Sequence, residues 1–367
     1  MDRRFAAAIS EHPVTATAVG EVAGEVLERL GGTPPDLALL FVTEAHAGAL
    51  EDAAAAVRTI LSPGVLLGCA AVAVAGPARE VEEQPGVSLW AGRVGPVAPL
   101  LLGPGLHGWP PEELGFPPSA VVLLGDPFSF PAETFLEVTG SLPVVGGMAS
   151  AARGPGGNRL ALDDRVVTSG AVGAVLGAPV RTLVSQGCRP IGNPYIVTKS
   201  ERNVVYELGG KPAVERLLRL ELDEDDVRLV NQGLHLGLVV DEHKSEFGRG
   251  DFLVRNVIGA DRENGAIAVG DIVEVGTTAQ YHVRDAATAD EDLRSMLAEA
   301  GSAAGALLFT CNGRGSRLFG MPDHDAGVLD EALDGAPVAG FFAAGEFGPV
   351  GGRNFLHGFT ASVALFD

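Results

Sequence analysis

The sequence predicts an α/β fold, with layered mixed sheets that are covered by helices and built from a repeated strand–helix–strand–strand unit. Near-continuous apolar runs of strand length alternate with segments of helical periodicity, which is typical of sheets covered on at least one face. The same order of elements occurs three times, and a Gly-marked apolar run forms the second strand each time. Long Gly-rich connections between the second and third strands favour antiparallel pairing of those two strands, so we expect mixed sheets.

Apolar spacing sets the expected element boundaries. Apolar residues between Val19 and Leu30 follow helical spacing, and Gly31 and Gly32 end this helix before the first copy begins. The predicted strands of the three copies are 37–42, 65–74 and 87–91, then 120–125, 142–150 and 171–176, then 306–311, 337–345 and 359–365. The predicted helices after the first strands carry Leu50, Val57 and Ile60, begin at Pro131, and run from about 325 to 333.

The block between the second and third copies has a different pattern. Residues 254–258 and 267–275 have strand composition and flank a turn at 261–265, which predicts a hairpin. A short helix is expected over 212–220, and a Thr-x-x-Glu capping box at 288–291 predicts the start of another.

Chain length and one acidic run predict the domain organisation. A chain of 367 residues favours two or more domains, and the acidic run 221–226 is the best candidate boundary. We therefore expect domains of 1–220 and 221–367. With 46% apolar and 20% charged residues, the chain can form packed cores without disulfides or metals.

Charge and cysteine content exclude several partners and compartments. Because 26 basic and 47 acidic residues give a net charge of −21, we expect binding to neither nucleic acid nor an anionic membrane. Three cysteines, Cys69, Cys188 and Cys311, form no disulfide framework and fit a reducing cytoplasm. No apolar run is long enough for a membrane-spanning helix, and the apolar run near the N-terminus is too short for a signal peptide.

Common catalytic and metal-binding signatures are missing from the sequence. It contains no Cys-x-x-Cys, His-Glu-x-x-His, Walker A or Gly-x-Ser-x-Gly motif, and its eight histidines have no metal-ligand spacing. We therefore expect neither catalytic residues nor a metal site, and no cofactor.

Three polar, Gly-rich segments interrupt or follow apolar strands, where α/β proteins usually place their sites. Segment 185–192 contains Cys188 and Arg189 on an expected tight turn. Segment 309–317 follows a buried strand, and segment 340–349 carries a glutamate among apolar residues and glycines.

These segments predict a site for a small ligand with an anionic group. Arg314 would hold that group, with Arg189 or Arg255 nearby, because guanidinium groups match carboxylates. Glu346 would take a cation or a hydrogen-bond donor, and it would lie close to Arg314 if the two loops leave neighbouring strands. The remaining predicted ligand-binding residues, at the pocket wall or nearby, are Cys188, Cys311, Asn312, Gly313, Gly315 and His357.

The segments together resemble the two-part form of the FIST family of sensory domains. The resemblance rests on Ser-Gln-Gly-Cys-Arg-Pro-Ile-Gly at 185–192, on 197–208, on Phe-Thr-Cys-Asn-Gly-Arg-Gly at 309–315, and on 339–349. It implies a FIST N-terminal-like domain over 1–220 and a FIST C-terminal-like domain over 221–367. It also implies sensing of an amino acid or similar small molecule, with no established enzymatic reaction. Members of the family are often fused to signalling modules, and because we expect no room for one here, we expect signalling to a partner protein in trans.

Four alternatives remain open from the sequence. Arg314 and Glu346 could form a structural pair that closes the fold. One branch of the family resembles haem-based nitric oxide sensors, although no haem-ligating motif matches residue by residue. Cys311 or Cys188 could be the nucleophile of an enzyme, and the chain could be an interaction module that binds no ligand.

Overall fold

The structure, a computed structural model, describes residues 4–111, 114–244, 246–248 and 250–367. The chain divides into two compact units, and the second is inserted into the sequence of the first. Unit 1 comprises Met1–Val184 and Arg294–Asp367, and unit 2 comprises Ser185–Leu293. Among the described residues, no helix combines the length and apolar character needed to cross a membrane.

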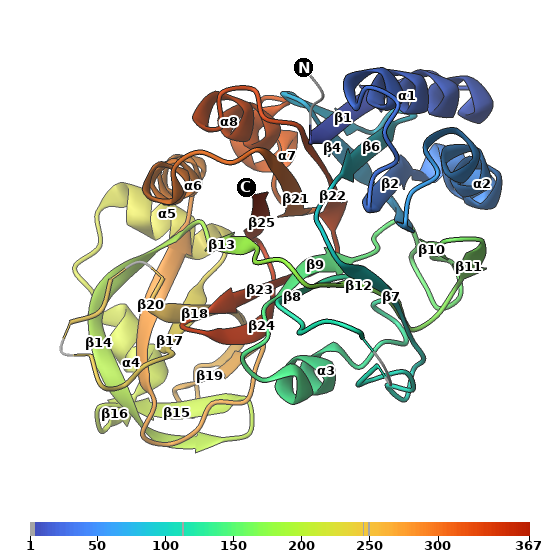
Figure 1. The fold of residues 1–367 in the computed structure, drawn as a ribbon. Coiled ribbons are helices and arrows are strands. Elements are labelled where there is room, and N and C mark those ends of the chain that lie inside the picture. The colour runs from blue at the N-terminus through green and yellow to red at the C-terminus, as the bar shows by residue number, and fades with distance from the viewer. Residues whose placement is uncertain (1–3, 112–113, 245, 249) are drawn as a thin grey trace. The chain divides into compact units, whose positions relative to one another are not determined.

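Within its described residues, unit 1 contains three structural repeats of six strands each (Figure 1). The first repeat consists of β1 (Phe5–Ser10), β2 (Leu37–Thr43), β3 (Val65–Ala71), β4 (Ala73–Gly76), β5 (Arg79–Glu82) and β6 (Val87–Gly92). The second consists of β7 (Val97–Leu102), β8 (Ala120–Gly125), β9 (Val144–Met148), β10 (Leu160–Leu162), β11 (Arg165–Val167) and β12 (Ala171–Leu176). The third consists of β13 (Arg181–Ser185), β21 (Gly305–Cys311), β22 (Val338–Ala343), β23 (Glu346–Val350), β24 (Arg353–His357) and β25 (Ala361–Phe366).

The strand pairing confirms mixed sheets but corrects one expected pairing. In each repeat the first two long strands are parallel: β2 with β3, β8 with β9, and β21 with β22. The last strand pairs antiparallel with the first of these, not with the second: β6 with β2, β12 with β8, and β25 with β21. The predicted antiparallel pairing of second and third strands is therefore wrong, because the Gly-rich connection between them forms a separate hairpin.

That hairpin leaves its own repeat and extends the sheet of another. β4–β5 adds to β22, β10–β11 adds to β3, and β23–β24 adds to β9, so the three repeats exchange hairpins in a ring. Each six-stranded sheet consequently contains strands of two repeats. Phe41, Phe309 and Phe341 pack against one another in the core that the three sheets share.

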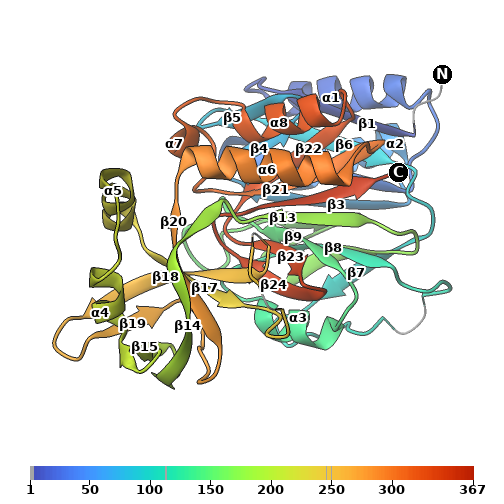
Figure 2. The same ribbon diagram turned by 90° about the vertical axis from the view of Figure 1, so that its left-hand side faces the viewer.

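Helices cover the outer faces of these sheets. The helices of unit 1 are α1 (Thr15–Arg29), the short 3-10 helix at Glu44–Ala49, α2 (Leu50–Leu61), α3 (Ala132–Thr139), α7 (Ser316–Phe319) and α8 (His324–Ala332). Apolar faces of α1 and α2 pack on the sheet of the first repeat (Figure 1). Helix α8 lies along β5 and β22 (Figure 2), so the hairpin of the first repeat contacts the crossover helix of the third.

Helix α6 (Ala286–Ala300) leads from unit 2 back into the third repeat. It begins two residues before the predicted capping box, so Thr288 lies inside the helix. Asp285 replaces it as the capping side chain, because Asp285 Oδ1 accepts a hydrogen bond from Thr288 N at 2.6 Å.

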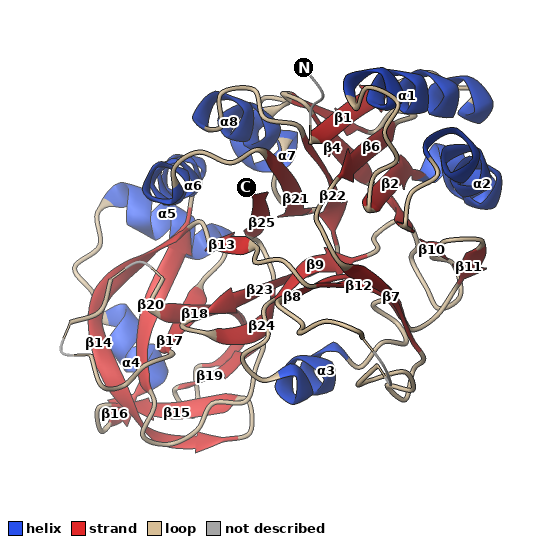
Figure 3. Ribbon diagram, in the orientation of Figure 1, coloured by secondary structure: helices blue, strands red, loops and turns tan. Residues whose placement is uncertain are grey.

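Unit 2 consists mostly of strands (Figure 3). Its elements are β14 (Cys188–Glu201), β15 (Val204–Leu208), β16 (Lys211–Pro212), α4 (Ala213–Leu218), α5 (Glu224–Gln232), β17 (His235–Val239), β18 (Phe252–Asp261), β19 (Ala266–Val269) and β20 (Thr278–Arg284). Strands β14, β20, β17, β18, β19 and β15 pair in that order, and β15 pairs back onto β14, which closes a ring. The predicted hairpin corresponds to β18–β19, although β19 ends at Val269 rather than at 275.

Candidate functional site

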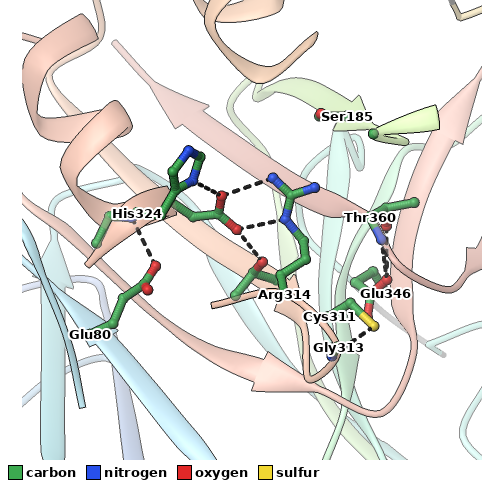
Figure 4. Close-up of polar contacts among 12 residues, drawn as sticks. Glu80, Ser185, Cys311, Gly313, Arg314, His324, Glu346 and Thr360 are labelled. Carbon is green, nitrogen blue, oxygen red and sulfur yellow. Dashed lines mark hydrogen bonds and ion pairs between the residues drawn. The ribbon is translucent and has the colours of Figure 1, made fainter. Parts of the chain in front are cut away.

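A polar cluster lies where the parallel strands of the third repeat end. Residues 311–315 follow β21, and Glu346 opens β23 shortly after β22 ends. Because β21 and β22 are parallel neighbours, their carboxyl ends meet at one sheet edge. This arrangement brings Cys311, Arg314 and Glu346 together with Thr360 (Figure 4), and the charge of Arg314 acts on the Glu346 carboxyl.

Arg314 is held by a carboxylate other than Glu346. Its Nε and Nη2 donate to Asp325 Oδ2 and Oδ1 at 2.7 and 2.8 Å, and both side chains are fully buried. Thr310 and His324 also contact this carboxylate, at 2.6 and 2.9 Å. Burial opposes ionisation of Asp325, but the charge and hydrogen bonds of Arg314 hold its pKa well below the usual range. The Arg314–Asp325 pair is therefore a charged, structural anchor.

Glu346 is fully buried and its two oxygens differ. Oε2 accepts hydrogen bonds from Thr360 N at 3.1 Å and from Thr360 Oγ1 at 2.8 Å. Oε1 accepts no hydrogen bond from the residues that the structure describes. Burial raises the pKa of Glu346 to about 8, and Thr360, Arg314 and the Cys311 thiol offset only part of this effect. A raised pKa favours the protonated carboxyl at neutral pH, which would have Oε2 as its accepting oxygen and Oε1 as its hydroxyl.

The other two repeats show that the fold does not need a carboxyl at this position. Glu346 pairs with Gly147 in β9, and the equivalent residues are Val74, opposite Phe341, and Leu160, opposite Cys69. Both equivalents are apolar and buried. An ionisable group at position 346 is thus a feature of the third repeat alone.

Cys311 occupies the end of β21 with its thiol beside Glu346 (Figure 4). The thiol sulfur accepts a hydrogen bond from Gly313 N at 3.4 Å and lies 3.8 Å from Asn312 Oδ1, toward which it donates. Asn312 N donates in turn to Ala343 O at 2.9 Å, which ties this loop to the end of β22. The loop therefore holds the thiol in a fixed, polar setting.

Gly315 is required by the path of the chain that follows. Its φ is +60°, and a Cβ there would lie 2.7 Å from the Phe342 ring and 2.8 Å from Glu82 Oε2. Glu82 in turn accepts hydrogen bonds from Ser316 N and Ser316 Oγ, both at 2.9 Å. These hydrogen bonds tie the residue after Gly315 to the exchanged hairpin of the first repeat.

Sequence reasoning missed Asp325 as the partner of Arg314, and it missed a second buried acid, Glu80. Glu80 lies in the exchanged hairpin, where its Oε1 accepts from Ala326 N at 3.0 Å at the start of α8. Its Oε2 accepts no hydrogen bond from the described part of the chain. Burial, followed by the charge of Asp325, raises its pKa to about 8. The sequence carried no signal for this burial, because the alternation in Arg-Glu-Val-Glu at 79–82 predicts Val81 on the buried face and Glu80 on the opposite one.

The other predicted site residues have partners elsewhere. In unit 2, Arg189 lies on β14 rather than on a tight turn and pairs with Asp226. Arg255 pairs with Asp271 at 2.7 Å, and Cys188 opens β14 and is buried. In unit 1, His357 lies opposite Glu346 on β24, with its Nε2 2.9 Å from Gly348 O.

Comparison with known proteins identifies the family of this chain. Residues 36–211 match the FIST N domain and residues 213–349 match the FIST C domain. An uncharacterized protein of Mycobacterium tuberculosis is 44% identical over 99% of both chains. An uncharacterized protein of Mycobacterium bovis is also 44% identical, over 99% of this chain and 98% of its own length. The chain therefore belongs to the FIST family of sensory and signalling domains, in the two-part arrangement that its sequence predicted.

Proposed function

We propose that this protein senses a small intracellular molecule, an amino acid or another small carboxylate, and signals in trans to a partner protein. The ligand would bind at the cluster of Cys311, Arg314 and Glu346. The observation that carries the proposal is the buried Glu346 carboxyl, whose Oε1 accepts no hydrogen bond from the described residues and whose place is apolar in both other repeats.

The chemistry of the cluster favours an oxygen-rich, anionic ligand. A buried hydroxyl of a protonated carboxyl needs an acceptor, and a carboxylate oxygen supplies one. Arg314 adds a fixed positive charge, because Asp325 keeps the guanidinium in place. Glu346 would then act as a donor to the ligand rather than as an anion that attracts an ammonium group.

Signalling to a partner in trans is the second part of the proposal, and it rests on membership of a family of sensory and signalling domains. Cytoplasmic placement fits the three cysteines, none of which forms a disulfide.

Thermal unfolding with a panel of amino acids and small carboxylates tests this function. We expect at least one compound to raise Tm, since a ligand at about 100 times its Kd adds roughly 2.7 kcal/mol to the free energy of unfolding. Glu346→Leu copies Leu160 of the second repeat, so it should fold and lose the response. Glu346→Gln retains a neutral donor and should keep part of it.

Glu80→Gln is the matched control, because Glu80 is a second buried carboxyl of unit 1 with a similarly raised pKa. It should respond to the compound like the unaltered protein. A panel without any stabilising compound would argue against the sensor function, and so would a Glu346→Leu variant with an unchanged response.

A further inference from the structure

Cys311 has polar and charged neighbours, unlike a cysteine that packs in an apolar core. Gly313 N donates to the sulfur, the Glu346 carboxyl lies beside it, and Arg314 follows three residues later. Cys69 provides the contrast within unit 1: it is fully buried in β3, and burial raises the pKa of its thiol well above the usual range. Cys311 thus has a hydrogen-bond donor for a thiolate and an acid within reach. In the other two repeats the position of Glu346 is occupied by Val74 and Leu160, which are not acids.

We propose that Cys311 is a modification site at which a small hydroperoxide oxidises the thiol to a sulfenic acid, with Glu346 as the proton donor. The inference shares the Glu346 carboxyl with the proposed ligand site but does not require the ligand, since it rests in addition on the thiol and on the Gly313 amide. Cys311 is 6% exposed, which restricts the oxidant to small molecules such as hydrogen peroxide.

The reaction balances with the groups in place. Cys311 loses its thiol proton to solvent, and the thiolate attacks the distal oxygen of the hydroperoxide, so an S–O bond forms and the O–O bond breaks. Sulfur is oxidised and the peroxide is reduced. The departing alkoxide or hydroxide takes the Oε1 proton of Glu346, which regains a proton from solvent. The products are Cys311 sulfenic acid and an alcohol, or water from hydrogen peroxide.

Treatment of the intact chain with hydrogen peroxide tests the inference, with dimedone added as the protein is denatured so that it reaches a buried sulfenic acid, and with peptide mass spectrometry as the readout. We expect Cys311 to be labelled at least about tenfold faster than Cys69, and Cys311→Ser to remove that label. Glu346→Gln preserves the shape and the Thr360 hydrogen bonds but cannot donate a carboxyl proton. It should slow the labelling by about tenfold or more.

The pH profile separates proton donation from packing. Among the described residues, the titratable and charged groups that face Glu346 are the Cys311 thiol, Arg314, and His357 across the hairpin. The rate should rise as the thiolate forms and fall as Glu346 loses its proton near pH 8, whereas Glu346→Gln should lack the fall. Equal labelling of Cys311 and Cys69, or the same rate and profile in Glu346→Gln, would overturn the inference.

Discussion

Replacing Asp325 by alanine is expected to lower the free energy of unfolding by about 3 to 5 kcal/mol. Asp325 and Arg314 are both fully buried and joined by two hydrogen bonds of 2.7 and 2.8 Å. The substitution leaves the Arg314 guanidinium without its bidentate carboxylate in a region from which water is excluded. Urea unfolding, followed by circular dichroism, measures the loss directly.

An exposed ion pair of the same unit provides the control. Arg294 Nη1 lies 2.8 Å from Glu331 Oε2, with side chains 46% and 72% exposed. Glu331→Ala should therefore change stability by less than about 1 kcal/mol. Replacing both members of the buried pair, Arg314→Met with Asp325→Leu, should recover much of the loss because no charge stays buried. A loss below about 1 kcal/mol in Asp325→Ala would mean that the pair is not the anchor of this loop.

The repeated strand order could be predicted because it depends on local periodicity. Apolar runs such as 37–42 and 306–311 are fully buried strands, and the helices that follow them show one apolar face. Parallel pairing of the first two strands then follows from the crossover helix. The same reasoning placed the loops of Arg314 and Glu346 at one sheet edge.

The hairpin exchange could not be predicted from the sequence. Strands β4 and β5 have four residues each, and nothing local in them specifies a partner more than two hundred residues away in β22. Consequently the sequence offered no reason to place Glu80 and Glu82 beside α7 and α8. The partner of Arg314 was missed for a related reason. The path of the loop between β21 and α8 brings Asp325 to Arg314, and the sequence does not specify that path.

The stability that Glu80 and Glu346 contribute is expected to fall as pH rises from about 5 to about 8, because both carboxyls keep their protons in the folded state. Their pKa values rise from 4.5 to about 8 on folding. Between these two values the unfolded chain has lost both protons while the folded chain retains them, so raising the pH favours unfolding. At about 1.4 kcal/mol per pH unit, each carboxyl accounts for roughly 3 to 5 kcal/mol over the whole range.

The variant with both Glu80→Gln and Glu346→Gln isolates this effect. Near pH 5 it should match the unaltered protein, because glutamine has the shape of a protonated glutamate and keeps an oxygen for Ala326 N and for Thr360. The difference in free energy of unfolding should grow in favour of the variant up to about pH 8 and then level off, since both states are ionised above the folded pKa. The lowered pKa values of His235 and His282 act in the opposite direction, because they raise stability as pH rises toward the ordinary histidine value of 6.5. This histidine effect is the same in both proteins, so it cancels in the difference between them. Parallel curves from pH 5 to pH 9 would mean that the two carboxyls are ionised in the folded protein, and Glu346 would then face a ligand as an anion.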